Sequence, residues 1–134
     1  MSEPLLIRYY RAEDRAQIRQ ICAETGFLGD PVDPLFEDRE LFADFLTSPY
    51  TDAEPENCLV LEGENRRLLG YVMGSRSVWK HMGYLAYRMP GWVLRAIWGY
   101  FFSYREPSRR YLRWVLSRGR KETPSTPKRG VHFH

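Results

Sequence analysis

The sequence predicts an α/β fold of the α+β kind, in which helices pack on a mixed sheet. Runs of alternating apolar residues, typical of strands, occur near residues 5–10, 57–62 and 68–74. Two amphipathic stretches, typical of helices, separate the first two runs. The last four residues, 131–134, alternate again and favour a further strand. We expect a mixed sheet because two helices occupy one crossover while two strands are joined tightly.

The first strand is expected over Leu5–Tyr10, and a helix follows over residues 12–25. Ile18, Ile21 and Cys22 recur at helical spacing, so Cys22 belongs to a buried stripe. Gly26 is the expected C′ residue that ends the helix.

A loop rich in Gly, Pro and Asp covers Phe27–Phe36, and Asp38 is the expected cap of a second helix. Pro49 should end that helix. Its apolar positions are Leu41, Phe42, Phe45 and Leu46. The runs 57–62 and 68–74 then form a hairpin, because the five residues between them include Gly63.

The remaining residues predict a basic helical hairpin, a loop over 121–130 and the final strand. The first helix is expected to start at Leu94, and Ser108 should cap the second helix. An aromatic stripe in this part of the chain is expected in the core: Trp92, Trp98, Phe101 and Phe102. The second helix should turn four residues inward: Tyr111, Leu112, Val115 and Leu116.

Charge divides the chain into two parts. Residues 1–75 contain 7 Lys/Arg and 15 Asp/Glu, whereas residues 76–134 contain 13 and 2. One interpretation is that the two parts attract each other across the fold; the other is that the basic part faces an anionic partner. Basic residues that could touch phosphates are Arg109, Arg110, Arg113, Arg118, Arg120 and Lys121.

Composition predicts one globular cytoplasmic domain with reduced thiols. The chain has 134 residues, of which 43% are hydrophobic, and its two cysteines, Cys22 and Cys58, form no disulfide framework. We find no leader sequence, and the longest apolar stretch, residues 93–104, is interrupted by Arg95 and too short to cross a bilayer.

The order of elements resembles the N-terminal half of the GNAT acetyltransferase superfamily. The resemblance is carried by "LLIRYYRAED", by a helix ending in "TGF" and by the hairpin "CLVLEGENRRLLGYVMG". The closing "VHFH" is similar to the start of the family's fourth strand in members with a helical insertion before it. The resemblance therefore implies one truncated domain over 1–134: the first half over 1–75, a basic helical insertion over 76–130 and the start of a central strand over 131–134.

The resemblance implies transfer of an acetyl group from acetyl-CoA to an amine. The family holds the CoA pyrophosphate on a Q/R-x-x-G-x-G/A loop at a helix N-terminus, and this loop is absent from the sequence. Residues 67–72 and 88–93 have the Arg and first Gly, but each ends in Val where a small residue is needed. No cofactor-binding residue is assigned, and the chain alone is expected to be inactive.

Five residues are candidates for the acceptor side of such a site. In the family the loop between the first two helices lines the acceptor cleft, so Phe27, Asp30 and Asp33 are candidates for substrate binding. Asp30 and Asp33 could hold a cationic amine, although Asp beside Pro and Gly is typical of turns. His132 and His134 point the same way along a strand and could act as a base. No metal site is expected, because no third ligand has suitable spacing.

Two alternatives remain open at this point. The basic helices could form a non-catalytic module that binds nucleic acid or an anionic membrane. Alternatively, the terminal strand could pair with another chain that completes the domain, because an open strand edge is a template for pairing.

Overall fold

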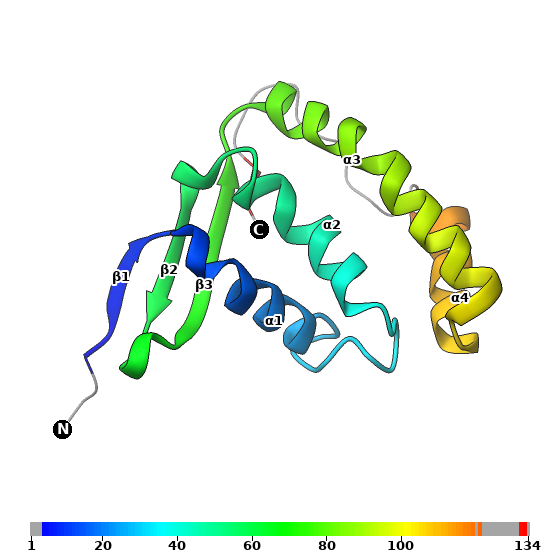
Figure 1. Cartoon of the computed structure of the whole chain (residues 1–134), viewed down its shortest axis with the longest axis horizontal. Coiled ribbons are helices and arrows are strands. Elements are labelled where there is room, and N and C mark those ends of the chain that lie inside the picture. Colours follow the sequence, from blue (N-terminus) through cyan, green and yellow to red (C-terminus); the bar gives the residue numbers. More distant parts are fainter. Residues whose placement is uncertain (1–3, 120, 122–131, 134) are drawn as a thin grey trace.

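A computed structural model describes residues 4–119, 121 and 132–133 and shows helices packed on one four-stranded sheet (Figure 1). The order of strands in the sheet follows the chain: β1 (Leu6–Tyr9), β2 (Cys58–Glu62), β3 (Leu68–Ser75) and β4 (His132–Phe133). The strands and the α+β class are as expected. The terminal strand is also present, since Gly74 of β3 pairs with Phe133 and Ser75 with His132.

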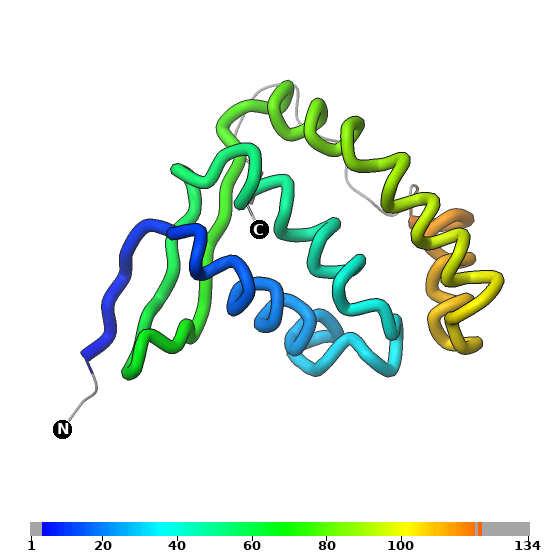
Figure 2. Tube along the Cα trace, viewed as in Figure 1, coloured from blue at the N-terminus to red at the C-terminus, as the bar shows by residue number. Residues whose placement is uncertain are grey.

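The expected mixed sheet is wrong for the described strands, because every neighbouring pair is antiparallel. The reason lies in the two helices between β1 and β2. Helix α1 (Arg15–Thr25) leads away from the sheet and α2 (Arg39–Thr51) leads back (Figure 2). The chain therefore re-enters the sheet at the end where β1 left it, which makes β2 antiparallel to β1.

A hydrophobic cluster fixes α1 against the sheet. Ile18 of α1 is fully buried against the inward side chains of β2 and β3. The cluster's buried members are Ile18, Cys58, Val60, Leu68 and Met73. Cys22 is also buried, as its helical spacing predicts. An ion pair supports the same joint: Arg8 of β1 donates two hydrogen bonds to the buried carboxylate of Asp14, just before α1.

The ends of α1 and α2 agree in part with those expected from the sequence. Thr25 ends α1 as expected, but Gly26 has φ −69° and so is not a left-handed stop. Glycine is required there by close approach, since a Cβ would lie 2.5 Å from the Phe42 ring. Asp38 caps α2, accepting a hydrogen bond from the Leu41 N–H at 3.0 Å.

The expectation that Pro49 ends α2 is wrong. The helix continues to Thr51 with Pro49 fully buried inside its last turn. A proline removes one helical hydrogen bond, but its fixed φ is helical, so one further turn can follow it. Phe45, expected inward, is 47% exposed.

The hairpin between β2 and β3 is confirmed, with Glu62 pairing Leu68 across the five-residue connection. Asn65 and Arg66 turn the chain there with φ of 54° and 60°.

The helical hairpin starts earlier than the sequence predicts. Helix α3 spans Val78–Trp98 and continues through a wider turn, Gly99–Ser103, whereas we expected a start at Leu94. Ser77 caps it, because its hydroxyl accepts a hydrogen bond from the Lys80 N–H at 3.3 Å. The adjacent Pro90 and Gly91, which imply a break, lie inside the helix.

Helix α4 (Glu106–Trp114) has Arg105 at its N-cap position, without a capping hydrogen bond from the side chain, and not the expected Ser108. Ser108 is buried, and its hydroxyl instead accepts a hydrogen bond from the Glu37 N–H at 2.9 Å. A second wide turn, Val115–Gly119, follows α4. Most of the expected loop 121–130, together with Val131, Arg120 and His134, lies outside the described residues.

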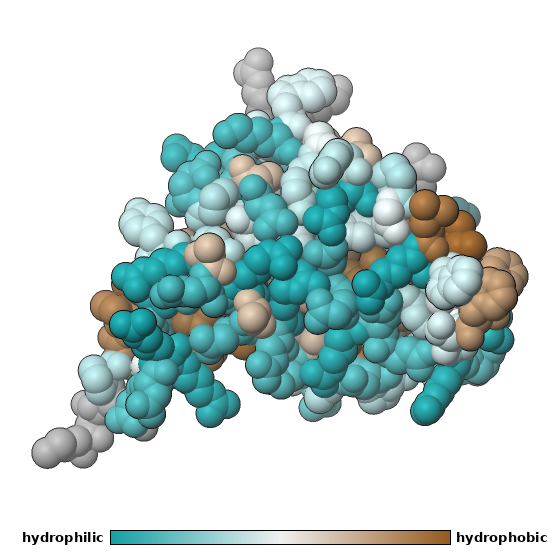
Figure 3. All heavy atoms as spheres, in the orientation of Figure 1, coloured by the Kyte–Doolittle hydropathy of each residue, from teal (hydrophilic) through white to brown (hydrophobic). Residues whose placement is uncertain are grey.

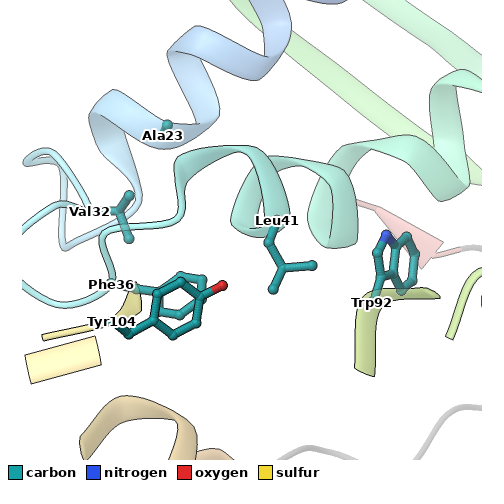
Figure 4. Packing of buried hydrophobic residues seen from close by; sticks show 6 residues of the cluster. All are labelled: Ala23, Val32, Phe36, Leu41, Trp92 and Tyr104. Carbon is teal, nitrogen blue, oxygen red and sulfur yellow. The ribbon is translucent and has the colours of Figure 1, made fainter. Parts of the chain in front are cut away.

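A second hydrophobic cluster joins this hairpin to α1 and α2 (Figure 4). Its buried members are Ala23, Val32, Phe36, Leu41, Trp92 and Tyr104. The expectation of a buried aromatic stripe holds only for Trp92. Trp98, Phe101 and Phe102 are exposed, because Trp92 on the opposite side of α3 packs in the cluster with Leu41 instead. Val115 and Leu116, expected inward on the second helix, are exposed as well.

Oppositely charged parts of the chain meet at this joint. Arg88 of α3 pairs with Asp44 of α2, and Arg95 pairs with Asp38 at 2.8 Å. Attraction between the acidic and basic parts therefore accounts for some of the charge division.

Candidate active site

The candidate site lies at the end of β3, where the terminal strand β4 pairs with it. Antiparallel pairing places the backbone of His132 beside Ser75. The other histidine candidate, His134, lies outside the described residues. Of the five candidate residues, His132 is thus the one beside the β3–β4 junction.

A buried carboxylate lies at the same junction. Glu54, which follows α2, is 2% exposed. It accepts hydrogen bonds from the Ser75 hydroxyl and from the Arg76 N–H, the latter at 3.2 Å. Within the described part of the chain, Glu54 has no ion pair. Burying a carboxylate without a cation costs roughly several kcal/mol. Hydrogen bonds to the Glu54 side chain offset part of this cost.

Sequence reasoning missed Glu54. Its acidic neighbours Asp52 and Glu56 are typical of an exposed loop. Pro55, which starts a 3-10 turn directly after Glu54, is the local signal of a sharp change of direction. The burial of Glu54 depends on its contact with Ser75, which lies 21 residues later in the chain. The spacing of residues in the sequence does not reveal such a contact.

A hydrogen-bonded ionic cluster lies on the joint between α1, α2 and α3. Asp44 accepts from Arg19 at 2.8 Å, from the Trp92 indole N–H at 2.7 Å, and also from Arg88 and Ser48. Because these donors occupy both oxygens of its carboxylate, Asp44 links the three helices to one another. It offers no open position to a substrate.

Asp52 and Tyr84 form a neighbouring pair. The Tyr84 hydroxyl donates to Asp52 at 2.7 Å, and Arg15 donates to the same carboxylate at 3.2 Å. Burial and the bond to Asp52 raise the pKa of Tyr84 to about 12, so this phenol stays protonated at neutral pH.

The loop between α1 and α2 is locked by its own bonds. Phe27 and Asp30 exchange two backbone hydrogen bonds of 2.9 Å, and both side chains are exposed. Asp33 pairs with Arg39 at 2.6 Å, which lowers the pKa of that carboxyl. The charge of Asp33 is thus already compensated.

The structure does not bring this loop to the β3–β4 junction. The loop precedes α2, whereas Glu54 follows it, and a helix of 13 residues is roughly 20 Å long at 1.5 Å per residue. Figure 1 shows the loop at the far ends of α1 and α2 from the sheet. Asp30 and Asp33 therefore do not share a site with His132 in this conformation.

The described residues do not form a cradle for the CoA pyrophosphate. Residues 68–72 belong to β3, where Gly70 pairs with Leu61 of β2. Residues 88–93 lie inside α3, where helical hydrogen bonds use the backbone N–H groups. Both near matches to the family loop thus have no run of free amides to offer. In the described residues no group of three His, Cys, Asp or Glu could hold a metal ion.

The two cysteines, Cys22 and Cys58, are free and buried. Burial raises the pKa of Cys58 to about 12, with Glu56 and Glu54 adding to it, and burial also raises the pKa of Cys22. A thiol with so high a pKa carries almost no thiolate at neutral pH, and the thiolate is the reactive form.

We therefore expect neither thiol to react with Ellman's reagent at pH 8 in the folded chain. Both should react at once in guanidinium chloride, which serves as the control. Rapid release of two equivalents of thionitrobenzoate without denaturant would contradict the burial of both side chains.

No protein-family model matches this chain, and no curated protein gives a significant match. A solved structure does resemble it: the crystal structure of SsHAT, with a TM-score of 0.66 and 22% sequence identity. The match covers 97% of this chain, and the chain spans 64% of the length of SsHAT. At this identity the likeness shows a shared fold.

Proposed function

We propose that these residues form the amine-accepting part of a GNAT-type N-acetyltransferase, which transfers an acetyl group from acetyl-CoA to an amine. The observation that carries the proposal is the fold shared with SsHAT over 97% of the chain. A second observation supports it: β4 adds to β3 beside the buried Glu54, as the family's fourth strand adds to its sheet.

His132 is the proposed general base. The neutral imidazole of a histidine can accept the proton of an ammonium group. Glu54 is the proposed positioning residue, since it touches Ser75 and Arg76 at the end of β3 and is too buried to touch substrate. It would fix the strand end against which β4 pairs.

The pyrophosphate of acetyl-CoA does not fit the described residues, because they offer no cradle of free backbone amides. The proposal therefore concerns these residues together with a pyrophosphate-binding loop that the sequence does not contain. For the same reason, we expect the 134-residue chain alone to give no measurable transfer.

The test is CoA release by the whole natural protein that contains this chain. It is given acetyl-CoA and four amines: a polyamine, an aminoglycoside, a lysine peptide and a peptide with a free N-terminus. We expect transfer to at least one. His132→Ala should lower kcat by about 100-fold or more and remove the acidic limb of its pH profile, whereas the control Glu64→Ala in the β2–β3 turn should change neither. A natural protein that neither binds acetyl-CoA in calorimetry nor acetylates any amine would contradict the proposal.

A further inference from the structure

One side of α3 presents large apolar side chains to the outside of the molecule. This apolar stripe consists of Leu94, Ile97, Trp98, Phe101 and Phe102, whose exposed fractions run from 49% for Ile97 to 71% for Phe102. Spacing of three and four residues places Leu94, Ile97 and Trp98 on one face of α3. Phe101 and Phe102 follow in the wider turn after it. Figure 3 shows hydrophobic atoms gathered over this end of the α3–α4 hairpin.

The stripe is not a poorly packed part of the core. Trp92 and Ala96, on the other side of α3, pack in the cluster with Leu41 and Tyr104. Within the stripe the rings of Trp98 and Phe102 contact each other with centroids 4.6 Å apart. Helix α3 is therefore apolar on two sides, and only one of them has a partner within the described residues.

Leaving the stripe in water has a substantial cost. Burying a large apolar side chain is favourable, and contiguous exposed patches of this kind mark interaction surfaces. Exposed apolar residues continue from the stripe toward the start of α3 and into the turn after α4: Trp79, Met82, Tyr87, Val93 and Leu116.

The same hairpin carries a strong positive charge. Residues 78–119 contain eight Lys or Arg and one acidic residue, Glu106. Arg88, Arg95 and Arg113 have acidic partners. Arg105, Arg110 and Arg118 are exposed, and none of them forms an ion pair within the described ranges.

We propose that the α3–α4 hairpin binds the surface of a lipid bilayer that contains anionic lipids. The stripe would lie in the headgroup region, with α3 parallel to the surface, and the arginines would face the lipid phosphates. Tryptophan and phenylalanine favour this depth, and arginine is attracted to the negative surface potential. Among the described helices none is long and apolar enough to cross a membrane, so the contact is with one leaflet.

The positive charge of the hairpin argues against a dimer in which a second copy of the chain covers the stripe. A symmetric dimer through this face would bring two strongly positive hairpins together, and like charges repel. Nucleic acid would match the charge, but Leu94 and Ile97 cannot stack on bases as aromatic rings do. An anionic bilayer satisfies both the charge and the aliphatic side chains.

The first experiment measures sedimentation of the 134-residue chain with vesicles. Vesicles of phosphatidylcholine containing about one third phosphatidylserine are compared with phosphatidylcholine alone, at low salt and at about 0.5 M salt. We expect binding to the anionic vesicles to be about tenfold or more stronger, and to weaken in high salt. No binding to anionic vesicles at low salt would overturn the proposal.

The second experiment separates the two contributions. The double variant Trp98→Ser, Phe102→Ser should lower binding to anionic vesicles by about tenfold or more. Arg110→Glu with Arg118→Glu should lower it to the level of neutral vesicles. The matched control is Leu28→Ser, a side chain that is 95% exposed in the loop before α2, and it should leave binding unchanged.

Circular dichroism melts show whether each variant is folded, and because all these side chains are exposed, the fold should persist. Three results would overturn the proposal. One is a stripe variant that binds vesicles as the parent does. Another is a dimer in ultracentrifugation that the stripe variant abolishes. The third is tight binding to DNA, with no vesicle binding, that the stripe variant does not change.

Discussion

Asp44→Ala should lower the free energy of unfolding by about 3–5 kcal/mol, the range for breaking a buried charge cluster. The carboxylate of Asp44 is 15% exposed and holds Arg19 and Arg88 on either side. Without it two guanidinium groups remain close together and the Trp92 N–H loses its acceptor. Denaturation in urea, followed by circular dichroism, measures the change.

The matched control is Asp33→Ala, which removes an exposed ion pair with Arg39. Because exposed pairs are screened by water and salt, this variant should unfold as the parent does. If Asp44→Ala loses no more stability than Asp33→Ala, the cluster does not hold the helices together.

Acid should weaken the same joint. Burial alone raises the pKa of Asp44, but hydrogen bonds from Ser48, Trp92 and Arg19 and the charge of Arg88 outweigh it, so the pKa lies below its ordinary value. A carboxyl with a depressed folded pKa contributes stability that is fully present above its unfolded pKa of about 3.9. That contribution is lost as the pH falls through the lower folded value, and Asp44→Asn should flatten this part of the profile.

Gly99→Ala should lower the free energy of unfolding by about 2–3 kcal/mol, because the added methyl group overpacks the joint between α3 and α4. A Cβ at Gly99 would lie well inside contact distance of three atoms of the Tyr104 ring. The ring is buried, and its hydroxyl donates to Asp38, so it cannot move without losing that bond.

Gly91→Ala is the control in the same helix. A Cβ there meets no atom within 4 Å, and alanine favours a helix interior over glycine by about 1 kcal/mol. Thermal melts of the two variants should therefore move in opposite directions. A Gly99→Ala protein as stable as the parent would show that the ring of Tyr104 can shift freely.

The elements of residues 4–75 could be predicted well because local chemistry specifies them. The Asp38 cap, the glycine-containing turn after β2 and the Ile18–Cys22 stripe each act over a few residues. The antiparallel sheet escaped prediction because it depends on where α2 returns the chain, which is a property of packing.

The hairpin was harder to predict because its sequence has two apolar faces. Periodicity identifies a stripe at Leu94–Phe102 but cannot say whether protein covers it, and the face that is buried contains Trp92, Ala96 and Gly99 instead. Pro90 and Gly91 concealed the first half of α3. At the candidate site, alternation predicted the strand that contains His132. The burial of Glu54 could not be predicted, because it depends on Ser75 and Arg76, more than 20 residues later.

The strand order has a consequence for variation in chain length. Strand β3 ends at Ser75, and β4 begins beside it at His132, so the whole hairpin leaves and rejoins the sheet at one strand edge. Lengthening or shortening this excursion leaves the pairing of Ser75 with His132 unchanged, and each doubling of its length costs only about 0.6 kcal/mol in closure entropy. Proteins with this scaffold can therefore exchange the hairpin for shorter or longer versions while the β3–β4 junction stays intact.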